Sequence, residues 1–306
     1  MVCTNCAGTE NRVKEGGNPN AGVVPEMMLH KNLLPENFRA DMKHSIGKVG
    51  MYHFDLSSTV TACKLTPCLP KLTIDTWTSA YAAVQTALSA AEATLQSTDA
   101  DTTAMFALIR PPGHHATTNL CGGYCYLNNV IICASYSLRQ NPQLKCVIID
   151  VDFHHGNGVE EILQRKPTEP TDNWRARCRY ISLHAHPEYP YYTTHLPTPL
   201  PKTVTAETYL SLLREGLDGV KKWCGNEVLV LVSLGLDTLS GDPIGGFDGF
   251  ANVEEYIGIG KEIGDFSRAV NAKTCFLLEG GYVVAKLGVC VENVFRGFIN
   301  STTNPN

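Results

Sequence analysis

The sequence lacks the short glycine-rich motifs that mark several large enzyme classes. Neither GxxxxGK[ST] nor GxGxxG occurs in the 306 residues, which excludes the two commonest phosphate-binding loops. GxSxG is also absent, which excludes the nucleophile elbow of the α/β-hydrolases. A catalytic function of this chain must therefore rest on other groups.

Long apolar runs and an excess of basic residues are missing as well. The best apolar run, VLVLVSLGL at 228–236, has the length of a strand and is too short to span a membrane. The formal net charge of −5 provides no basic surface for nucleic acid. The first residues, MVCTNCAGTENRVKEGG, contain no apolar segment of the kind found in secretory signals. We therefore expect a cytoplasmic or nuclear protein without membrane anchoring or direct nucleic-acid binding.

The cysteines do not follow the spacing of a zinc site or a disulfide framework. Cys3 and Cys6 form a CxxC without a second pair, and Cys63 and Cys68 have the wrong spacing to supply one. In a chain of this length without a secretory signal, we expect the twelve cysteines to be reduced and mostly buried.

What is present is an ordinary globular composition with an alternating pattern. Residues 1–50 are polar and rich in Gly and Asn, and we predict an irregular segment there. No repeat or linker interrupts the remainder, so we predict one catalytic domain over 51–300. Apolar runs of strand length alternate in this domain with helical patterns, which is typical of a parallel sheet covered on both faces. The predicted strands are 105–109, 146–151, 180–183, 228–234 and 274–278, and the predicted helices are 76–95, 124–138, 158–164, 206–223, 253–270 and 287–298.

Each predicted strand is followed by polar sequence that can carry chemistry. RPPGHHA follows the first strand, DVDFHHGNG the second, HAH the third, GLDTLSGDP the fourth and EGGYV the fifth. Because the carboxyl ends of parallel strands meet at one edge of the sheet, we expect these segments to converge on one pocket.

The second of these segments predicts a metal site. Alternate residues of an extended chain point to the same side, so Asp150, Asp152 and His154 share a face if the strand continues past Val151. Asp237, which follows the next strongly apolar strand, is the best candidate for a further ligand. One imidazole and two carboxylates, with a position left open, form the pattern of a catalytic zinc, although iron or cobalt would also fit.

Other loops supply the groups that a metal-activated water needs. His114 and His115 offer imidazoles, and Asp150 and Asn157 could each orient one of them. Tyr282 could donate a hydrogen bond to an oxyanion opposite the metal. This set predicts attack of water on an amide or ester.

At these residues the sequence resembles the zinc-dependent deacetylases of the arginase–deacetylase superfamily. Within this superfamily it resembles the class II-like branch, which contains histone deacetylase-like enzymes and acetylpolyamine amidohydrolases. The resemblance implies the α/β arginase–deacetylase fold, a single domain with a parallel sheet sandwiched by helices. It also implies removal of acetyl groups from acetyl-lysine in proteins or from acetylated polyamines, with one Zn²⁺ per chain and a structural K⁺. The supporting segments occur in family order: RPPGHHA, GGYCYLNN, DVDFHHGNG, SLH, SLGLDTLSGDP and LEGGY.

The resemblance also implies a role for each matching residue. The zinc ligands are Asp152, His154 and Asp237. The tandem histidines are His114 and His115, of which His115 is the general base and acid, and their partners are Asp150 and Asn157. Tyr282 polarises the acetyl carbonyl and stabilises the oxyanion. The walls of the acyl channel are Gly123, Tyr124 and Tyr189, and the potassium site comprises Asp150, Asp152, His154, Ser182 and Leu183.

Two departures from the family pattern bear on activity and substrate. The family has a further strand and loop before GMYHFD (50–55), and we expect the chain to lack part of this segment; TVTACKLTPCLPK (59–71) is an expected insertion. Ile244 stands where a polyamine-selective relative has an acidic residue, which argues against that way of binding a polyamine.

Two alternatives to a one-metal deacetylase follow from the same motifs. A two-metal hydrolase of the arginase type needs a second D-x-D on a late strand, and GLDTLS offers only Asp237. A catalytically impaired, truncated fold that binds acyl-lysine or acts as a scaffold is suggested by the short segment before residue 50. Because the ligands, both histidines and Tyr282 are all present, an active enzyme is favoured. The choice of substrate and the oligomeric state stay open.

Overall fold

The structure is a computed structural model of the chain. It describes residues 75–98, 104–165, 173–185 and 199–303, all of which belong to the compact unit His53–Asn306. The predicted irregular segment 1–50, the GMYHFD stretch and the predicted insertion at 59–71 lie outside the described residues.

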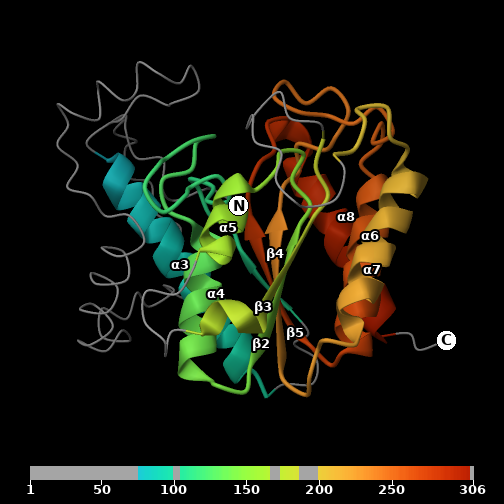
Figure 1. The fold of residues 1–306 in the computed structure, drawn as a ribbon. Helices are drawn as coiled ribbons and strands as arrows, with labels where there is room; N and C mark the ends of the chain where they lie inside the picture. The colour runs from blue at the N-terminus through green and yellow to red at the C-terminus, as the bar shows by residue number, and fades with distance from the viewer. Residues whose placement is uncertain (1–74, 99–103, 166–172, 186–198, 304–306) are drawn as a thin grey trace, which may run out of the picture. The chain divides into compact units, whose positions relative to one another are not determined.

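A five-stranded parallel sheet forms the centre of this unit (Figure 1). Its strand order is β1-β5-β4-β2-β3, and every neighbouring pair is parallel. This arrangement confirms the predicted α/β class with a parallel sheet. The strands are β1 (Ala104–Ala107), β2 (Lys145–Asp150), β3 (Cys178–Ser182), β4 (Val228–Leu234) and β5 (Lys273–Leu278).

The most hydrophobic strand lies at the centre of the sheet. The central strand β4 has the sequence VLVLVSL, and all seven of its side chains are buried. Its neighbour β2 buries five of six side chains, and Ile149 lies in register with Val232. A strand covered on both faces can place apolar side chains on either side, which is why these runs are continuous and do not alternate.

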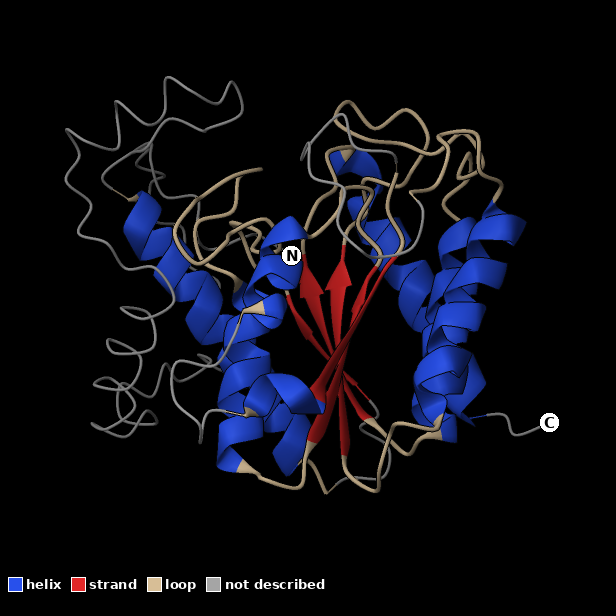
Figure 2. Ribbon diagram, viewed as in Figure 1, coloured by secondary structure: helices blue, strands red, loops and turns tan. Residues whose placement is uncertain are grey.

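Helices cover the two faces of the sheet (Figure 2). One layer contains α3 (Thr76–Gln96), α4 (Asn129–Gln140) and α5 (Asn157–Gln164), with the short 3₁₀ helix η2 (Trp174–Arg177) beside α4. The other layer contains α6 (Ala206–Lys221), α7 (Glu255–Ala269) and α8 (Val284–Thr303).

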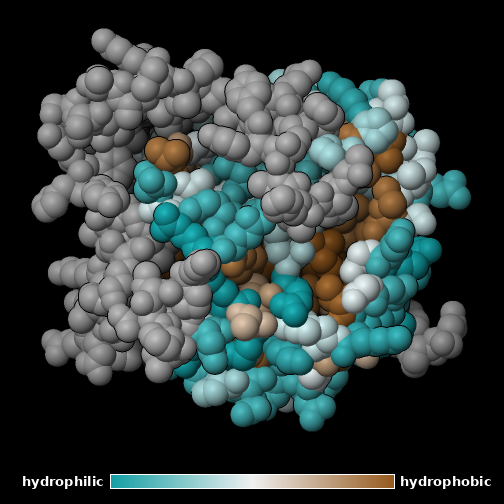
Figure 3. All heavy atoms as spheres, in the orientation of Figure 1, coloured by the Kyte–Doolittle hydropathy of each residue, from teal (hydrophilic) through white to brown (hydrophobic). Residues whose placement is uncertain are grey.

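The helices bury one apolar stripe each. In α6, Tyr209, Leu213 and Leu217 recur every fourth residue and are all buried. Hydrophobic residues accordingly show along the inner side of the α6 and α7 layer, while its outer side is mostly hydrophilic (Figure 3). Within the described part of the chain, none of the helices has the length and apolarity that crossing a bilayer requires.

The start of α4 differs from the prediction. The helix was expected to begin at residue 124 but begins at Asn129. Gly122 and Cys125 instead pair through two main-chain hydrogen bonds of 3.2 and 2.8 Å, and Tyr124 has a positive φ of 65°. The Asn128 side chain then caps the helix by accepting from the Ile131 N–H. A tight turn therefore occupies the residues before α4.

The described cysteines are mostly buried, as expected, and the reduced state of the thiols stays a prediction. Eight cysteines lie in the described residues, none of them in a disulfide, and six of the eight are buried. Cys3, Cys6, Cys63 and Cys68 lie outside the described residues.

Candidate active site

The carboxyl ends of the five strands lie at one edge of the sheet, and the predicted site residues follow them (Figure 1). His154 Nδ1 lies 2.8 Å from Asp237 Oδ2 and 3.2 Å from Asp152 Oδ1. The candidate ligand atoms of these three residues all lie within 4.8 Å of one another. Both carboxylates are buried, at 1% and 0% exposure for Asp152 and Asp237.

Main-chain donors orient the two carboxylates. The Gly280 N–H donates to Asp152 Oδ2 at 2.8 Å, and the Phe153 N–H donates to Asp237 Oδ1 at 2.9 Å. A Cβ atom at Gly280 would lie 2.5 Å from Asp152 Oδ2 and 2.7 Å from Asp237 Oδ2, so glycine is required for this close approach. One oxygen of each carboxylate is thus held, and the other faces His154.

The electrostatics of this trio favour a bound cation. Burial raises the pKa of Asp237, and the neighbouring Asp152 carboxylate raises it further, to about 6. Burial also opposes ionisation of Asp152, but the charges of His114 and His154 outweigh it and hold its pKa well below the usual range. Burial lowers the pKa of His154, whereas hydrogen bonds to the two carboxylates raise it to about 10. An imidazole nitrogen with two buried carboxylates suits a divalent transition metal.

The way in which the ligands converge differs from the prediction. Strand β2 ends at Asp150, so the condition under which Asp150, Asp152 and His154 would share one face of an extended strand is not met. The Asp152 N–H donates to Asp150 Oδ1 at 3.2 Å, and the His154 N–H donates to Asp152 Oδ1 at 2.9 Å. Each of these side chains accepts a hydrogen bond from the main-chain N–H two residues later. Such bonds curl the chain into successive bends. These bends bring Asp152 and His154 together.

His114 is linked to the end of β2. Its Nδ1 lies 3.2 Å from Asp150 Oδ2, and the Tyr180 hydroxyl donates to the same oxygen at 2.8 Å. A Cβ at Gly156 would lie 2.4 Å from Asp150 Oδ2 and 2.3 Å from the Tyr180 oxygen, so glycine is needed beside them. Burial lowers the pKa of His114, but the Asp152 and Asp150 carboxylates raise it well above the ordinary value.

His115 has a different environment from that of its neighbour. Its Nδ1 lies 2.8 Å from Asn157 Oδ1, an uncharged acceptor at the start of α5. Burial lowers its pKa, and the imidazoles of His114 and His154 lower it further. The pKa values of the two adjacent rings, whose centroids lie 4.0 Å apart, are therefore shifted in opposite directions.

Tyr282 is held at the edge of the site by its main chain. Its N–H donates to Asp242 Oδ2 at 2.7 Å, and its ring centroid lies 5.9 Å from that of Tyr124. The Arg110 guanidinium lies over the Tyr282 ring at 5.7 Å and donates to the Gly281 carbonyl at 2.9 Å. Burial raises the pKa of Tyr282 well above 10, so the phenol keeps its proton and can donate it in a hydrogen bond.

Two of the predicted channel residues, Gly123 and Tyr124, lie beside His115 and Tyr282. A Cβ at Gly123 would lie only 2.1 Å from His115 Cδ2, so this glycine packs directly against the imidazole. Tyr124 and Ile244 are 41% and 45% exposed. Tyr189 lies outside the described residues.

Three residues of the site were not predicted from the sequence. Phe153 stands between two candidate ligands, and its ring contacts those of His154 and Phe247 at centroid distances of 5.2 and 4.8 Å. Its position in DFH could have indicated an aromatic wall. The sequence does not indicate a role in the site for Tyr180 or Glu279. Tyr180 lies inside a predicted strand, and Glu279 is in the same EGGY segment as Tyr282, to which the role was assigned.

The predicted potassium residues lie at the ends of β2 and β3. Asp150 is in register with Ser182, and the Leu183 N–H donates to the Asp150 carbonyl at 3.1 Å. The potassium ion stays a prediction. His155, to which no metal role was assigned, is buried, with Nε2 3.0 Å from Glu160 Oε2 and its ring 4.4 Å from that of His184.

A second set of possible ligands, His114, Cys125 and Glu279, lies beside the first. Here the carboxylate already accepts hydrogen bonds, from the Gly113 N–H at 2.7 Å and from the His114 N–H at 3.2 Å. Burial raises the pKa of the Cys125 thiol well above 9, which keeps it protonated. These groups fit a hydrogen-bonded wall better than a metal site.

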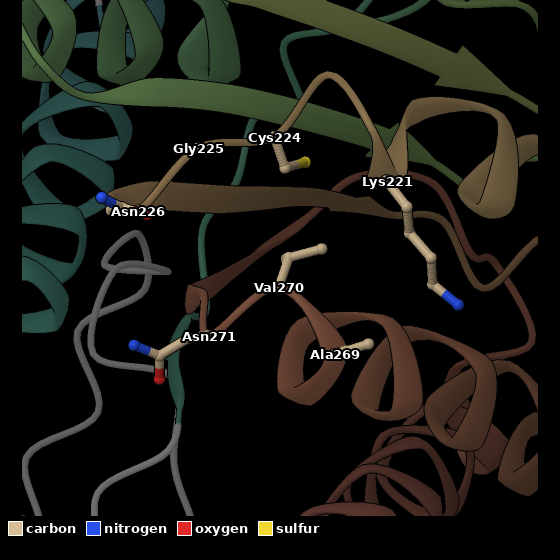
Figure 4. A pocket seen from close by; sticks show the side chains of 7 residues that line it. All are labelled: Lys221, Cys224, Gly225, Asn226, Ala269, Val270 and Asn271. Carbon is tan, nitrogen blue, oxygen red and sulfur yellow. The ribbon is translucent and has the colours of Figure 1, made fainter.

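A surface pocket of about 480 Å³ lies elsewhere (Figure 4). Its lining residues immediately precede β4 and β5, so it lies at the amino ends of these strands and is separate from the site. They are Lys221, Cys224, Gly225, Asn226, Ala269, Val270 and Asn271.

Comparison with known proteins agrees with this geometry. Residues 54–298 match the family model described as the histone deacetylase domain. The chain belongs to this family. The match confirms the resemblance inferred from the motifs.

The chain is similar both to acetylpolyamine amidohydrolases and to histone deacetylases. It is 30% identical over 268 residues to acetylpolyamine amidohydrolase 1 of Pseudomonas aeruginosa, an alignment that covers 83% of this chain and 68% of that protein. It is 30% identical over 214 residues to histone deacetylase 18 of Arabidopsis thaliana, covering 61% of this chain and 29% of that one. The solved structure of the acetylpolyamine aminohydrolase from Burkholderia pseudomallei has a TM-score of 0.62 and 27% identity, covering 74% of this chain and 64% of that chain. The chain thus spans about two thirds of the length of these amidohydrolases.

Proposed function

We propose that this protein is a zinc-dependent amidohydrolase that removes acetyl groups from N-acetylated amines. The observation that carries the proposal is the convergence of two buried carboxylates with a half-buried imidazole, two differently held imidazoles and a half-buried phenol at one edge of the sheet. Asp152, His154 and Asp237 would hold one Zn²⁺. When bound, the ion supplies Lewis acidity toward water and the acyl oxygen.

The histidine pair would handle the proton. When the Nδ1–H of His115 donates to Asn157, its Nε2 is the nitrogen that would accept a proton from the attacking water and return it to the departing amine nitrogen. His114, held through Nδ1 by Asp150, stands beside this ring and stabilises the negative charge that develops. The two rings thus have separate functions, because their partners differ in charge.

Tyr282 would stabilise the acyl oxygen. As a protonated phenol it donates a hydrogen bond to the oxyanion as the carbonyl carbon becomes tetrahedral. Asp242 and Arg110 hold the peptide group between Gly281 and Tyr282, because one accepts from its N–H and the other donates to its carbonyl. These contacts fix the main chain from which the phenol extends.

The substrate enters along aromatic walls. Tyr124 and Phe153 would enclose a narrow alkyl chain, with Gly123 making room beside His115, and Tyr189 stays a predicted member of this wall. Acetyl-lysine in proteins and acetylated polyamines both provide such a chain, and relatives named for each are similar to this chain. The apolar Ile244 offers no charge for a second amine. A structural K⁺ at the β2 and β3 ends and a cytoplasmic or nuclear location belong to the same proposal.

One experiment tests both the activity and the substrate class. Zinc-loaded protein is incubated side by side with an acetyl-lysine peptide and with acetylputrescine, and the released acetate is measured. We expect release from at least one of them, and the ratio of the two kcat/KM values identifies the class. If neither substrate releases acetate, the proposal of an active enzyme is wrong, and the alternative of an impaired fold that binds acyl-lysine or acts as a scaffold takes its place.

A further inference from the structure

Glu279 lies between two loops of the candidate site. One is the loop after β1 that carries His114 and His115, called the histidine loop below, and the other is the loop after β2 that carries Asp152 and His154. It follows β5 directly and is 0% exposed. Its Oε2 accepts from the Gly113 N–H at 2.7 Å and from the His114 N–H at 3.2 Å, and its Oε1 accepts from Ser233 Oγ at 3.3 Å. One carboxylate therefore links β5, β4 and the loop after β1.

The same segment also holds a candidate metal ligand. The N–H of the next residue, Gly280, donates to Asp152 Oδ2 at 2.8 Å. The Glu279 N–H donates to the Leu234 carbonyl and the Leu236 N–H donates to the Gly280 carbonyl, both at 3.0 Å. These bonds continue the β4–β5 pairing past the strand ends, so the backbone that carries Glu279 is fixed relative to the ligand.

Two main-chain N–H groups of the histidine loop have Glu279 as their hydrogen-bond acceptor. The His114 carbonyl accepts from the Gly158 and Val159 N–H groups at 3.1 and 3.2 Å, which attaches the loop to α5. On the donor side, Glu279 accepts from both Gly113 and His114. Buried main-chain N–H groups need partners, and the loss of this acceptor would leave two without one.

We propose that Glu279 is a positioning residue for catalysis. By accepting two hydrogen bonds from the histidine loop, it sets the distance between the histidine pair and the Asp152 side of the metal site. The inference rests on the proposed deacetylase function, because it concerns the same site. Small displacements of catalytic groups cost much of the rate, so even a modest relaxation of the loop lowers kcat.

Three substitutions separate this hydrogen-bonding role from one of charge. Glu279→Gln removes the charge but keeps a carbonyl oxygen for the two N–H groups, and its amide can donate to Ser233 Oγ. Glu279→Asp keeps the charge but is one methylene too short to reach the loop. Glu279→Ala removes both. The proposal therefore predicts that the neutral Gln variant is active and the charged Asp variant is impaired.

The experiment measures kcat and KM of each zinc-loaded variant for the acetylated substrate. We expect kcat to fall about 100-fold for Glu279→Ala and Glu279→Asp, with KM nearly unchanged, and Glu279→Gln to keep most of the rate. If Ala fails to fold, the Asp and Gln pair still decides the question. The proposal is overturned if Gln is as impaired as Asp, or if Ala or Asp matches the wild type.

A second readout is independent of catalysis. Hydrogen exchange of the Gly113 and His114 amides should be slow in the wild type and Glu279→Gln and fast in Glu279→Asp. An inactive wild type would refute the proposed function while this exchange still tests the Glu279 contact; equal exchange in all variants would refute the contact. Glu262→Gln is the control, because this buried carboxylate binds Arg214 between α7 and α6 and should leave kcat unchanged.

Discussion

The Tyr180 hydroxyl donates to Asp150 Oδ2 at 2.8 Å, the same oxygen that lies 3.2 Å from His114 Nδ1. Phenol, carboxylate and imidazole thus form one series of contacts between β3 and the loop that carries His114. Because Oδ2 has two hydrogen-bonding neighbours, the Asp150 rotamer is fixed and His114 is oriented with it. A strand residue of the neighbouring β3 therefore supports a histidine of another loop.

Replacing Tyr180 by Phe removes this hydroxyl and keeps the ring. We expect the free energy of unfolding to fall by about 1.5–3 kcal/mol, the usual contribution of a hydrogen bond to a charged group, and kcat to fall with it. Denaturant unfolding and steady-state kinetics measure the two effects. Tyr209→Phe is the matched control, because this buried hydroxyl has no hydrogen-bond partner among the described residues. Equal stability and rate in the two variants would contradict the role of Tyr180.

Replacing His115 by Ala removes the proposed general base. Positioned acid–base groups contribute about 10²–10⁴-fold to rates, and we expect kcat to fall within that range. Bound zinc, measured by elemental analysis, should stay at one per chain, because His115 is not among the candidate ligands. A variant that retained the wild-type kcat would show that another group moves the proton.

Replacing Tyr282 by Phe removes the proposed oxyanion donor. A lost donor of this kind lowers kcat by about 10²–10³-fold, and we expect a fall of this size with little change in KM. The ring contact with Tyr124 is kept, so folding should be unaffected. A wild-type rate in this variant would sink the assignment of Tyr282.

Replacing Gly123 by Ala tests the contact with His115. The added Cβ would lie 2.1 Å from His115 Cδ2, and the residue has a positive φ of 51°, so both crowding and strain oppose it. We expect a fall in thermal stability and in kcat. Gly219→Ala on the exposed side of α6 is the control, because the added Cβ would have no neighbour within 4 Å. We expect this variant to raise the free energy of unfolding by about 0.5–1 kcal/mol. If both variants behaved alike, the packing at Gly123 would not matter.

The sequence was sufficient to predict a parallel sheet and most of the residues that gather at its carboxyl edge. Runs such as VLVLVSL are apolar throughout because both faces are buried, and the polar residues begin where the strands reach the edge. Asp237 and Tyr282 could be placed for this reason alone. The same regularity cannot predict local bends: the end of β2 at Asp150 and the turn before α4 depend on side-chain and main-chain hydrogen bonds.

The residues that sequence reasoning missed act through distant partners. Glu279 bonds to residues 165 and 166 positions earlier, and Tyr180 bonds to Asp150 on a neighbouring strand. No local spacing indicates such pairs, because they are set by the order of strands in the sheet. The order β4-β2-β3 and the β1-β5 pairing became known only with the fold.

Removal and return of the metal tests the central claim most directly. The protein is dialysed against a chelator, and acetate release is measured before dialysis, after dialysis and after addition of Zn²⁺, in the wild type and in Asp237→Asn. We predict that the wild type loses activity and regains it with one zinc per chain, and that Asp237→Asn binds zinc more weakly and stays nearly inactive. Full activity of the metal-free wild type, or a wild-type rate and zinc affinity in Asp237→Asn, would contradict the account.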